Sequence, residues 1–247
     1  KHAPWPARGG HTGFAFNGRI WILGGSSDTG DLNDVWWSQN GTEWTQATSN
    51  ALWPPRGDLT SIVFSDKMWV LGGDENNDVW WSLDGVNWVQ ATEHAQWPSR
   101  ALLSSAVFDG KIWVIAGRID TDKDEIGNDV WSSSDGVNWT LVTDNVMWQP
   151  RQSHTSSVFD RKLWIFGGTQ SGGGYGDSWW TEDGRSWFEA PRFSDYSSPD
   201  PLIIDFEDKL WWLVSENDVW TFSPDEISDI YVSIATGNNV TGTGAEE

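Results

Sequence analysis

The feature that most constrains this chain is a tryptophan-rich pattern that recurs along almost its whole length. An apolar residue followed by tryptophan occurs about every 47 residues, with the tryptophan at Trp21, Trp69, Trp113, Trp164 and Trp211. Downstream of each comes an Asp-x-Trp step, which ends at Trp36, Trp80, Trp131, Trp179 and Trp220. With four opening and four late tryptophans, these positions hold 18 of the 22 tryptophans. Such a period indicates a repeat protein whose units bury their apolar faces against one another.

Each repeat predicts four short antiparallel strands, which in the first repeat cover 11–16, 20–25, 34–38 and 44–48. The first strand is rich in small residues, which suits an innermost position where the units converge. The second is apolar enough to be covered on both faces. We therefore predict an all-β fold, a β-propeller of five four-stranded blades over residues 1–236, followed by a flexible tail or linker at 237–247.

Asn-Gly and Asp-Gly pairs mark the turns within the blades. They lie between the first and second strands at Asn17 and Asp109, and between the third and fourth strands at Asn40, Asp84, Asp135 and Asp183. Such pairs favour two-residue type I′ hairpins, in which both central residues take positive φ. One face of the propeller should therefore carry tight turns. The opposite face should carry the longer loops between second and third strands, together with the links between blades.

The set of motifs resembles the kelch-repeat β-propeller family. The resemblance is carried by the late tryptophan, the Asn-Asp-Val-Trp entry to the third strand, an opening arginine and the glycine pairs at 24–25, 72–73 and 167–168. Repeat three departs from it with Ala116-Gly117. Repeat five departs further, with Val214-Ser215 and neither late tryptophan nor opening arginine. Because the family more often has six or seven blades, a sixth blade outside this segment stays open.

Ring closure follows from the same pattern. The chain begins with Trp5-Pro6-Ala7-Arg8, which has the sequence of a link between blades. In a closed ring of five, this link would follow blade five, whose outer strand would be residues 229–234.

Composition excludes some classes of partner. The chain has 36 acidic and 15 basic residues, a formal net charge of −21, and no cysteine. Nucleic acid and anionic lipid need clustered Lys and Arg, so neither is expected as a partner. No apolar run approaches the length of a membrane span, which argues against membrane insertion. Without cysteine there is no disulfide, thiolate metal site or cysteine nucleophile.

Four recurrent arginines and the variable loops supply the candidate binding residues. Arg8, Arg56, Arg100 and Arg151 could grip an anionic ligand near the axial mouth. Alternatively, each bonds to neighbouring backbone or to an aspartate and belongs to the architecture. The loops opening on the same face are Ser26–Asn33, Asp74–Asn77, Arg118–Asn128, Thr169–Gly176 and Ser215–Asn217, and they add the candidates Arg118, Asp74, Glu75 and Tyr175.

Three further groups each have a structural and a functional interpretation. Asp120, Asp122 and Asp124 alternate and could hold Ca²⁺, but their loop lacks the EF-hand spacing, and a solvated acidic loop is the alternative. His154 and His11 share a repeat position with leucine, which favours packing over catalysis. A second tryptophan follows the repeat tryptophan at Trp37, Trp81 and Trp180. These side chains either form stacking platforms for sugar rings or pack between blades.

The leading functional hypothesis is a non-enzymatic binding or scaffold propeller that recognises a protein or glycan through its long-loop face, without a cofactor. The kelch resemblance implies this role, and the fold alone does not establish it. One rival is a carbohydrate-active enzyme of the epimerase or mutarotase type. Another is a structural domain of a larger surface or filament protein. A secreted or cell-surface location is expected.

Overall fold

A computed structural model describes residues 2–74, 76–120, 122–123, 125–170, 173–190, 202–206, 209–213 and 219–222. The side chains of 120, 202–206, 210–213 and 219–222 lie outside this description. Within the described part the secondary structure is all β, with no helix. The predicted fold class is therefore confirmed in its coarse form.

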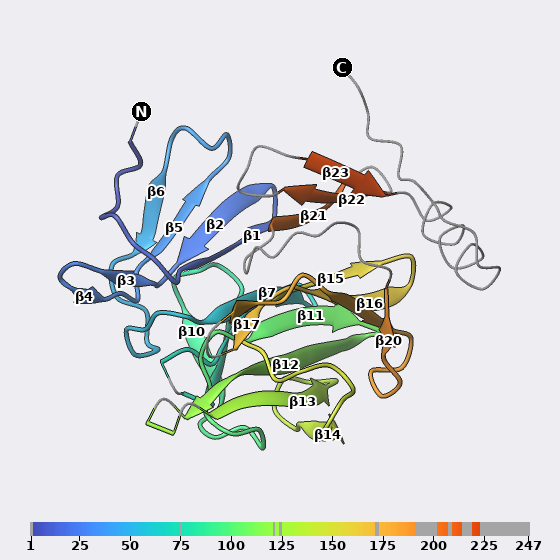
Figure 1. The fold of residues 1–247 in the computed structure, drawn as a ribbon. Coiled ribbons are helices and arrows are strands. Elements are labelled where there is room, and N and C mark those ends of the chain that lie inside the picture. Colours follow the sequence, from blue (N-terminus) through green and yellow to red (C-terminus); the bar gives the residue numbers. More distant parts are fainter. Residues whose placement is uncertain are drawn as a thin grey trace.

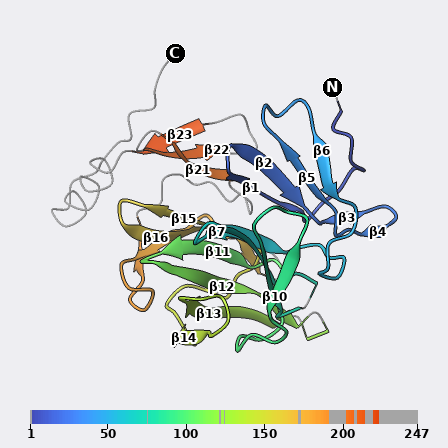
Figure 2. The same cartoon turned by 180° about the vertical axis from the view of Figure 1, so that it is seen from behind.

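Four four-stranded antiparallel sheets make a propeller-like arrangement (Figures 1 and 2). Blade 1 contains β1 (Thr12–Phe16), β2 (Arg19–Leu23), β5 (Val35–Ser38) and β6 (Thr45–Thr48). Blade 2 contains β7 (Thr60–Phe64), β8 (Lys67–Leu71), β9 (Val79–Ser82) and β10 (Trp88–Thr92). Blade 3 contains β11 (Ser104–Phe108), β12 (Lys111–Asp120), β13 (Glu125–Ser133) and β14 (Thr140–Thr143). Blade 4 contains β15 (Thr155–Phe159), β16 (Lys162–Phe166), β19 (Ser178–Thr181) and β20 (Phe188–Glu189).

The fifth repeat forms a three-stranded sheet from β21 (Leu202–Phe206), β22 (Lys209–Leu213) and β23 (Val219–Phe222). Strand β21 contacts β15 of blade 4, and Figure 1 draws the sheet between blade 4 and blade 1. The predicted outer strand at 229–234 and the predicted tail at 237–247 lie outside the described residues. Among the described residues, four four-stranded blades are therefore observed, and the fifth predicted blade is not confirmed.

The innermost strands of successive blades lie side by side and are joined by hydroxyl groups. Thr12 Oγ1 lies 2.6 Å from Ser61 Oγ, and Thr60 Oγ1 lies 2.7 Å from Ser105 Oγ. At the start of each inner strand, a backbone belt links the repeats: Asp58 N donates to Gly10 O, Leu102 N to Asp58 O, and Ser153 N to Leu102 O. The small polar residues predicted for this strand serve these close contacts.

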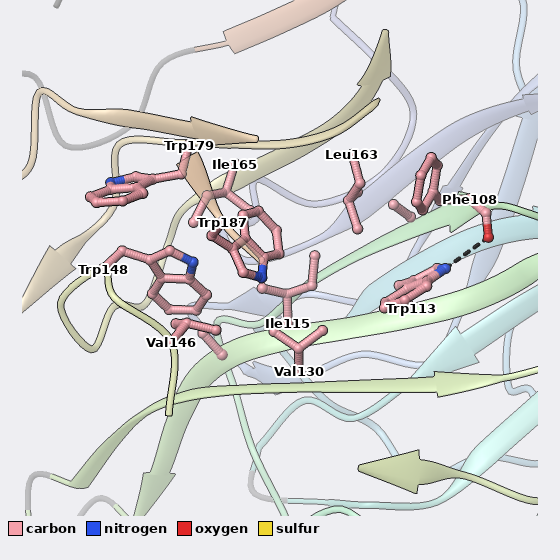
Figure 3. Packing of buried hydrophobic residues seen from close by; sticks show 12 residues of the cluster. Phe108, Trp113, Ile115, Val130, Val146, Trp148, Leu163, Ile165, Trp179 and Trp187 are labelled. Atoms are coloured by element: carbon pink, nitrogen blue, oxygen red, sulfur yellow. Dashed lines mark hydrogen bonds between the residues drawn. The ribbon is translucent and has the colours of Figure 1, made fainter. Parts of the chain in front are cut away.

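Apolar cores fill the space between blades, as Figure 3 shows for blades 3 and 4. In that core Trp148, from the link between the blades, packs edge-on against Trp187, with ring centroids 5.8 Å apart. The indole Nε1 of Trp113 donates a hydrogen bond to Phe108 O at 2.7 Å, so its polar atom is satisfied within the core. The tryptophans are thus mostly a packing device, since each aromatic ring buries a large area.

The turns between first and second strands match the prediction. Both central residues have positive φ at Asn17-Gly18 and Asp109-Gly110, and also at Ser65-Asp66 and Asp160-Arg161. This is the geometry of two-residue type I′ hairpins.

The turns between third and fourth strands were predicted wrongly. Only the glycine of each pair has positive φ, and the connection in blade 2 spans residues 83–87. Asp84 accepts hydrogen bonds from the backbone of Val86 and Asn87, and Ser82 Oγ accepts one from Gly85 N. A carboxylate that caps backbone donors therefore replaces the type I′ turn, as Asx-type turns do.

The predicted loop Arg118–Asn128 is also corrected. Strand β12 continues to Asp120 and β13 starts at Glu125, so most of this segment is a long hairpin rather than an irregular loop. Two other loops on this face contain short hairpins, β3 (Ser26–Ser27) with β4 (Gly30–Asp31), and β17 (Thr169–Gln170) with β18 (Gly173–Gly174).

Candidate functional site

The four recurrent arginines form intrablade clamps with the aspartates of the Asp-x-Trp steps. Arg100 donates to Asp129 Oδ1 and Oδ2 at 2.8 and 2.7 Å, and to Ala116 O at 2.7 Å. The equivalent pairs are Arg8–Asp34, Arg56–Asp78 and Arg151–Asp177. Arg56, Arg100 and Arg151 are 0% exposed, so a ligand cannot reach their guanidinium groups. This geometry agrees with the second interpretation, in which each arginine bonds to backbone and to an aspartate within the scaffold.

The clamp also explains the glycine pair after each second strand. Gly24, Gly72 and Gly167 take φ near +60° and present their carbonyl oxygen to the guanidinium group of Arg8, Arg56 and Arg151. Ala116 takes the same conformation, with φ of 47°, and accepts from Arg100. Repeat three therefore keeps the backbone conformation of the motif although alanine replaces glycine. The cost is the strain of a non-glycine residue in the left-handed region.

Burial alone would raise the pKa of Asp129, but hydrogen bonds and the charge of Arg100 hold it below its ordinary value. Hydrogen bonds and the charge of Arg151 do the same for the pKa of Asp177. Each aspartate also accepts from the indole of the repeat tryptophan, such as Trp131 Nε1 at 2.6 Å. These carboxylates are therefore charged, paired and committed to the fold.

The second tryptophans are capped by cations from the start of the second strand. Lys67 Nζ lies 4.0 Å from the ring centroid of Trp81, and the guanidinium carbon of Arg19 lies 3.8 Å from that of Trp37. Lys162 covers Trp180 in blade 4. Each ring also packs against its own sheet, so these contacts support the packing interpretation rather than open sugar platforms.

His154 is buried between blades 3 and 4, where Nε2 lies 2.7 Å from Ser104 Oγ. Burial, with the nearby charge of Arg151, lowers the pKa of His154 to about 3. Both partners are buried, which keeps this serine–histidine pair away from any substrate. His11, at the same repeat position in blade 1, is exposed.

Charged residues from three repeats meet on the loop face, and we call this group the axial rim: Asp31, Asp58, Asp74 and Arg118. Asp58 belongs to the belt at the start of the inner strands, where φ is +53°. Asp74 follows the glycine pair of blade 2 and accepts from Gly57 N at 2.6 Å. Arg118 lies at the corresponding position after the Ala-Gly pair of blade 3. The belt therefore places Asp58 beside the innermost strands, on the side of the loops that contain Asp74 and Arg118.

The rim carries more negative than positive charge, with three aspartates and one arginine. Burial raises the pKa of Asp58 above its ordinary value; Asp74 and Asp31 raise it further, while Arg118 opposes them. Burial also raises the pKa of Asp74, and the charge of Asp31 adds to this while the Gly57 hydrogen bond works against it. Neighbouring carboxylates repel one another, so a cationic group placed among them would be bound favourably.

The structure describes some of the other candidate residues from the sequence and leaves others undescribed. Tyr175 donates to Gln170 Oε1 at 2.8 Å and lies with its ring 4.8 Å from the guanidinium carbon of Arg151, beside the β17–β18 hairpin. Arg118 and Asp74 belong to the axial rim. Glu75 and Asp124 lie outside the described residues, as does the side chain of Asp120.

Sequence reasoning missed Asp58 and Asp31. Asp58 occupies a repeat position held elsewhere by Gly10, Leu102 and Ser153. A residue that breaks a repeat pattern is a functional candidate, and this signal was present in the sequence.

Among the described residues, no group of three His, Asp or Glu side chains is arranged to hold a metal ion. Of the proposed calcium ligands, Asp122 alone has a described side chain. The same residues include no helix long and apolar enough to cross a membrane.

Comparison with known proteins adds no relative. A scan against protein-family models finds no match to this chain, and a search of curated proteins finds none either.

Proposed function

We propose that this protein is a non-enzymatic binding or scaffold module that recognises a protein or glycan through its loop face. The observation that carries the proposal is the axial rim, where three aspartates and one arginine from three repeats lie within electrostatic reach of one another on the loop face. Rigid sheets hold the loops, and binding residues commonly lie on loops positioned by such a scaffold.

The chemistry of the rim favours a basic protein segment over a neutral glycan. Burial raises the pKa of both Asp58 and Asp74, repulsion from Asp74 and Asp31 adds to the rise at Asp58, and repulsion from Asp31 adds to the rise at Asp74. A lysine or arginine of a partner would remove that repulsion and form charge-assisted hydrogen bonds. The net charge of −21 would also speed the encounter with a basic partner.

The proposed scaffold is a kelch-type propeller of five blades, with the fifth repeat as the last blade. Its support is the sequence pattern, in which Trp211 and Trp220 repeat the apolar-Trp and Asp-x-Trp steps of the other four units. The three-stranded sheet of the fifth repeat lies beside blade 4, in the place where a fifth blade would begin.

The test compares wild-type protein with Asp58→Asn/Asp74→Asn on an array of lysine- and arginine-rich peptides and on a glycan array. We expect peptide binding that the double variant weakens at least tenfold. The matched control is Asp109→Asn/Glu182→Gln, which changes the net charge equally on the turn face and should leave binding intact.

Equal loss in both double variants would indicate a nonspecific charge effect and would contradict a rim site. Glycan binding that Asp58→Asn/Asp74→Asn leaves unchanged would also contradict a binding site at the rim. Asp109 is a conservative control position, because Asn17 occupies the equivalent turn in blade 1.

A further inference from the structure

One sheet face in this protein is exposed although its counterparts are buried. In the second strand of each blade, Ile20, Met68, Ile112 and Leu163 are equivalent. Ile20 is 42% exposed, whereas the other three are 0% exposed because the preceding blade covers them. We call this surface the open face of blade 1, made of Ile20, Gly41 and the half-buried tryptophans Trp5, Trp36 and Trp44.

The three buried interfaces use one contact. A tryptophan from the second strand of a blade lies against the turn glycine of the next blade: Trp21 against Gly85, Trp69 against Gly136, and Trp113 against Gly184. A Cβ on any of these glycines would lie 2.1–2.3 Å from the indole ring, so no larger residue fits. Gly41 is the equivalent glycine of blade 1, with φ of 73°, and it has nothing within 4 Å of such a Cβ.

We propose that the open face of blade 1 is the docking surface for the fifth repeat of this same chain, with Trp211 packed against Gly41. The register supports this pairing. Trp211 is the third residue of β22, as Trp21, Trp69 and Trp113 are third in β2, β8 and β12. The inference rests on the five-bladed scaffold proposed above and is independent of the binding role.

The belt at the start of the inner strands supports the same closure. It runs through Gly10, Asp58, Leu102 and Ser153, each two residues before its inner strand. Asp200 stands two residues before β21. The start of β21 therefore has the sequence position that would place the fifth repeat between Ser153 and Gly10, the two ends of the belt.

The fifth repeat is favoured over a second copy of the chain for two reasons. Its sheet already lies against blade 4, so its effective concentration at blade 1 is high. Two chains with a net charge of −21 repel each other, which opposes self-association at an apolar face.

Because the chain has no cysteine, single cysteines can report the exposure of chosen positions. We would place one at Ile20 in the full chain and measure its rate of thiol labelling under native conditions. Met68→Cys is the buried reference, at the same strand position of a covered blade. Leu52→Cys is the exposed reference, since Leu52 is 72% exposed.

We expect Ile20→Cys to label at least tenfold more slowly than Leu52→Cys, at a rate near that of Met68→Cys. Adding Trp211→Ala should raise the Ile20→Cys rate toward the exposed reference and leave Met68→Cys unchanged. Trp212→Ala, at the next position of β22, should have less effect on Ile20→Cys, because successive strand positions alternate between the two faces of a sheet.

Three results would overturn the proposal. The first is fast labelling of Ile20→Cys that Trp211→Ala does not alter. The second is protection that disappears on dilution, which would assign the face to a second copy. The third is protection that persists in both Trp211→Ala and Gly41→Leu, where the second variant disturbs the contact from blade 1. Peptide binding at the axial rim is measured separately, so failure of one proposal does not imply failure of the other.

Discussion

The three interfaces between successive blades and the open face of blade 1 contain the same kinds of residue in different environments. Trp53, Trp97 and Trp148 are buried links between blades, whereas Trp5, with the same role in sequence, is half-buried. Gly85, Gly136 and Gly184 each contact the tryptophan ring of a neighbouring blade, whereas Gly41 contacts no tryptophan in the described structure. A repeat residue therefore obtains its environment from the neighbouring unit, and the end of the array is where that environment has to be supplied.

The largest effect should come from breaking a clamp inside the covered part of the array. Arg100→Ala leaves Asp129 buried without its cation, and removal of one partner of a buried ion pair costs about 3–5 kcal/mol. Urea unfolding would measure the loss. Arg185→Ala, at an exposed turn position, is the control and should change the free energy of unfolding by less than about 0.5 kcal/mol. Similar losses in the two variants would refute the structural role of the clamp.

Matched glycine substitutions compare a covered and an exposed turn directly. In Gly136→Ala, left-handed backbone strain should cost about 1–2 kcal/mol, and overlap with Trp69 roughly 1–3 kcal/mol more. Gly41 has nearly the same φ. If Trp211 docks there, Gly41→Ala should lose as much free energy of unfolding as Gly136→Ala.

The contrary outcome is a Gly41→Ala loss limited to the backbone contribution. In a Trp211→Ala background, the overlap part of the Gly41→Ala loss should vanish while that of Gly136→Ala remains. Additive effects of Gly41→Ala and Trp211→Ala would show that the two residues do not touch.

The two equivalent histidines should respond differently to pH. Because the folded-state pKa of His154 is lowered from 6.5 to about 3, the unfolded chain takes up a proton first as the pH falls. The contribution of His154 to stability is complete above about pH 6.5 and is lost progressively toward pH 3, by about 2 kcal/mol at pH 5. Urea unfolding of His154→Leu between pH 7 and 5 should show a flatter dependence than wild type.

The matched variant for this test is His11→Leu, at the exposed equivalent position, where burial and Arg8 also lower the pKa. It should change the pH dependence less than His154→Leu. An unchanged slope in His154→Leu would mean that the histidine is not held neutral by burial.

The smallest effect concerns the cations over the second tryptophans. Lys67→Met removes the cation above Trp81 and should cost about 0.5–1 kcal/mol, measured by urea unfolding. Blade 3 provides the control, because Ser132 replaces this tryptophan and Lys111→Met should have almost no effect. Equal losses would assign the effect of Lys67 to strand propensity rather than to the ring.

Much of the blade could be predicted because its information is local. Alternation and turn residues placed the strands of blade 1 within a few residues, as in the predicted 11–16 strand, which corresponds to β1 (Thr12–Phe16). The turn after the third strand was predicted wrongly because the Asp-Gly pair does not reveal that Ser82 and Asp84 cap the backbone. For the arginines, sequence left two interpretations open, since Arg100 and its partner Asp129 are 29 residues apart.

The candidate site was less accessible to sequence reasoning. Arg118 and Asp74 were named from the variable loops, but their meeting with Asp58 and Asp31 was not expected. These residues come from three repeats, and their distances depend on how the blades pack around the axis. Asp58 broke the repeat pattern, yet that pattern gave no reason to join it to the other three.

By itself, the sequence determined the repeating unit: its strands, its hairpins and the tryptophans that would be buried. These follow from side-chain alternation and turn chemistry within a few residues, which every copy of the unit contains. The tertiary structure decided which arginines are sealed from ligands, which charges gather at the axial rim and which blade has an uncovered face. Those properties depend on contacts between repeats, and the exposure of a residue is set by whatever the neighbouring blade places against it.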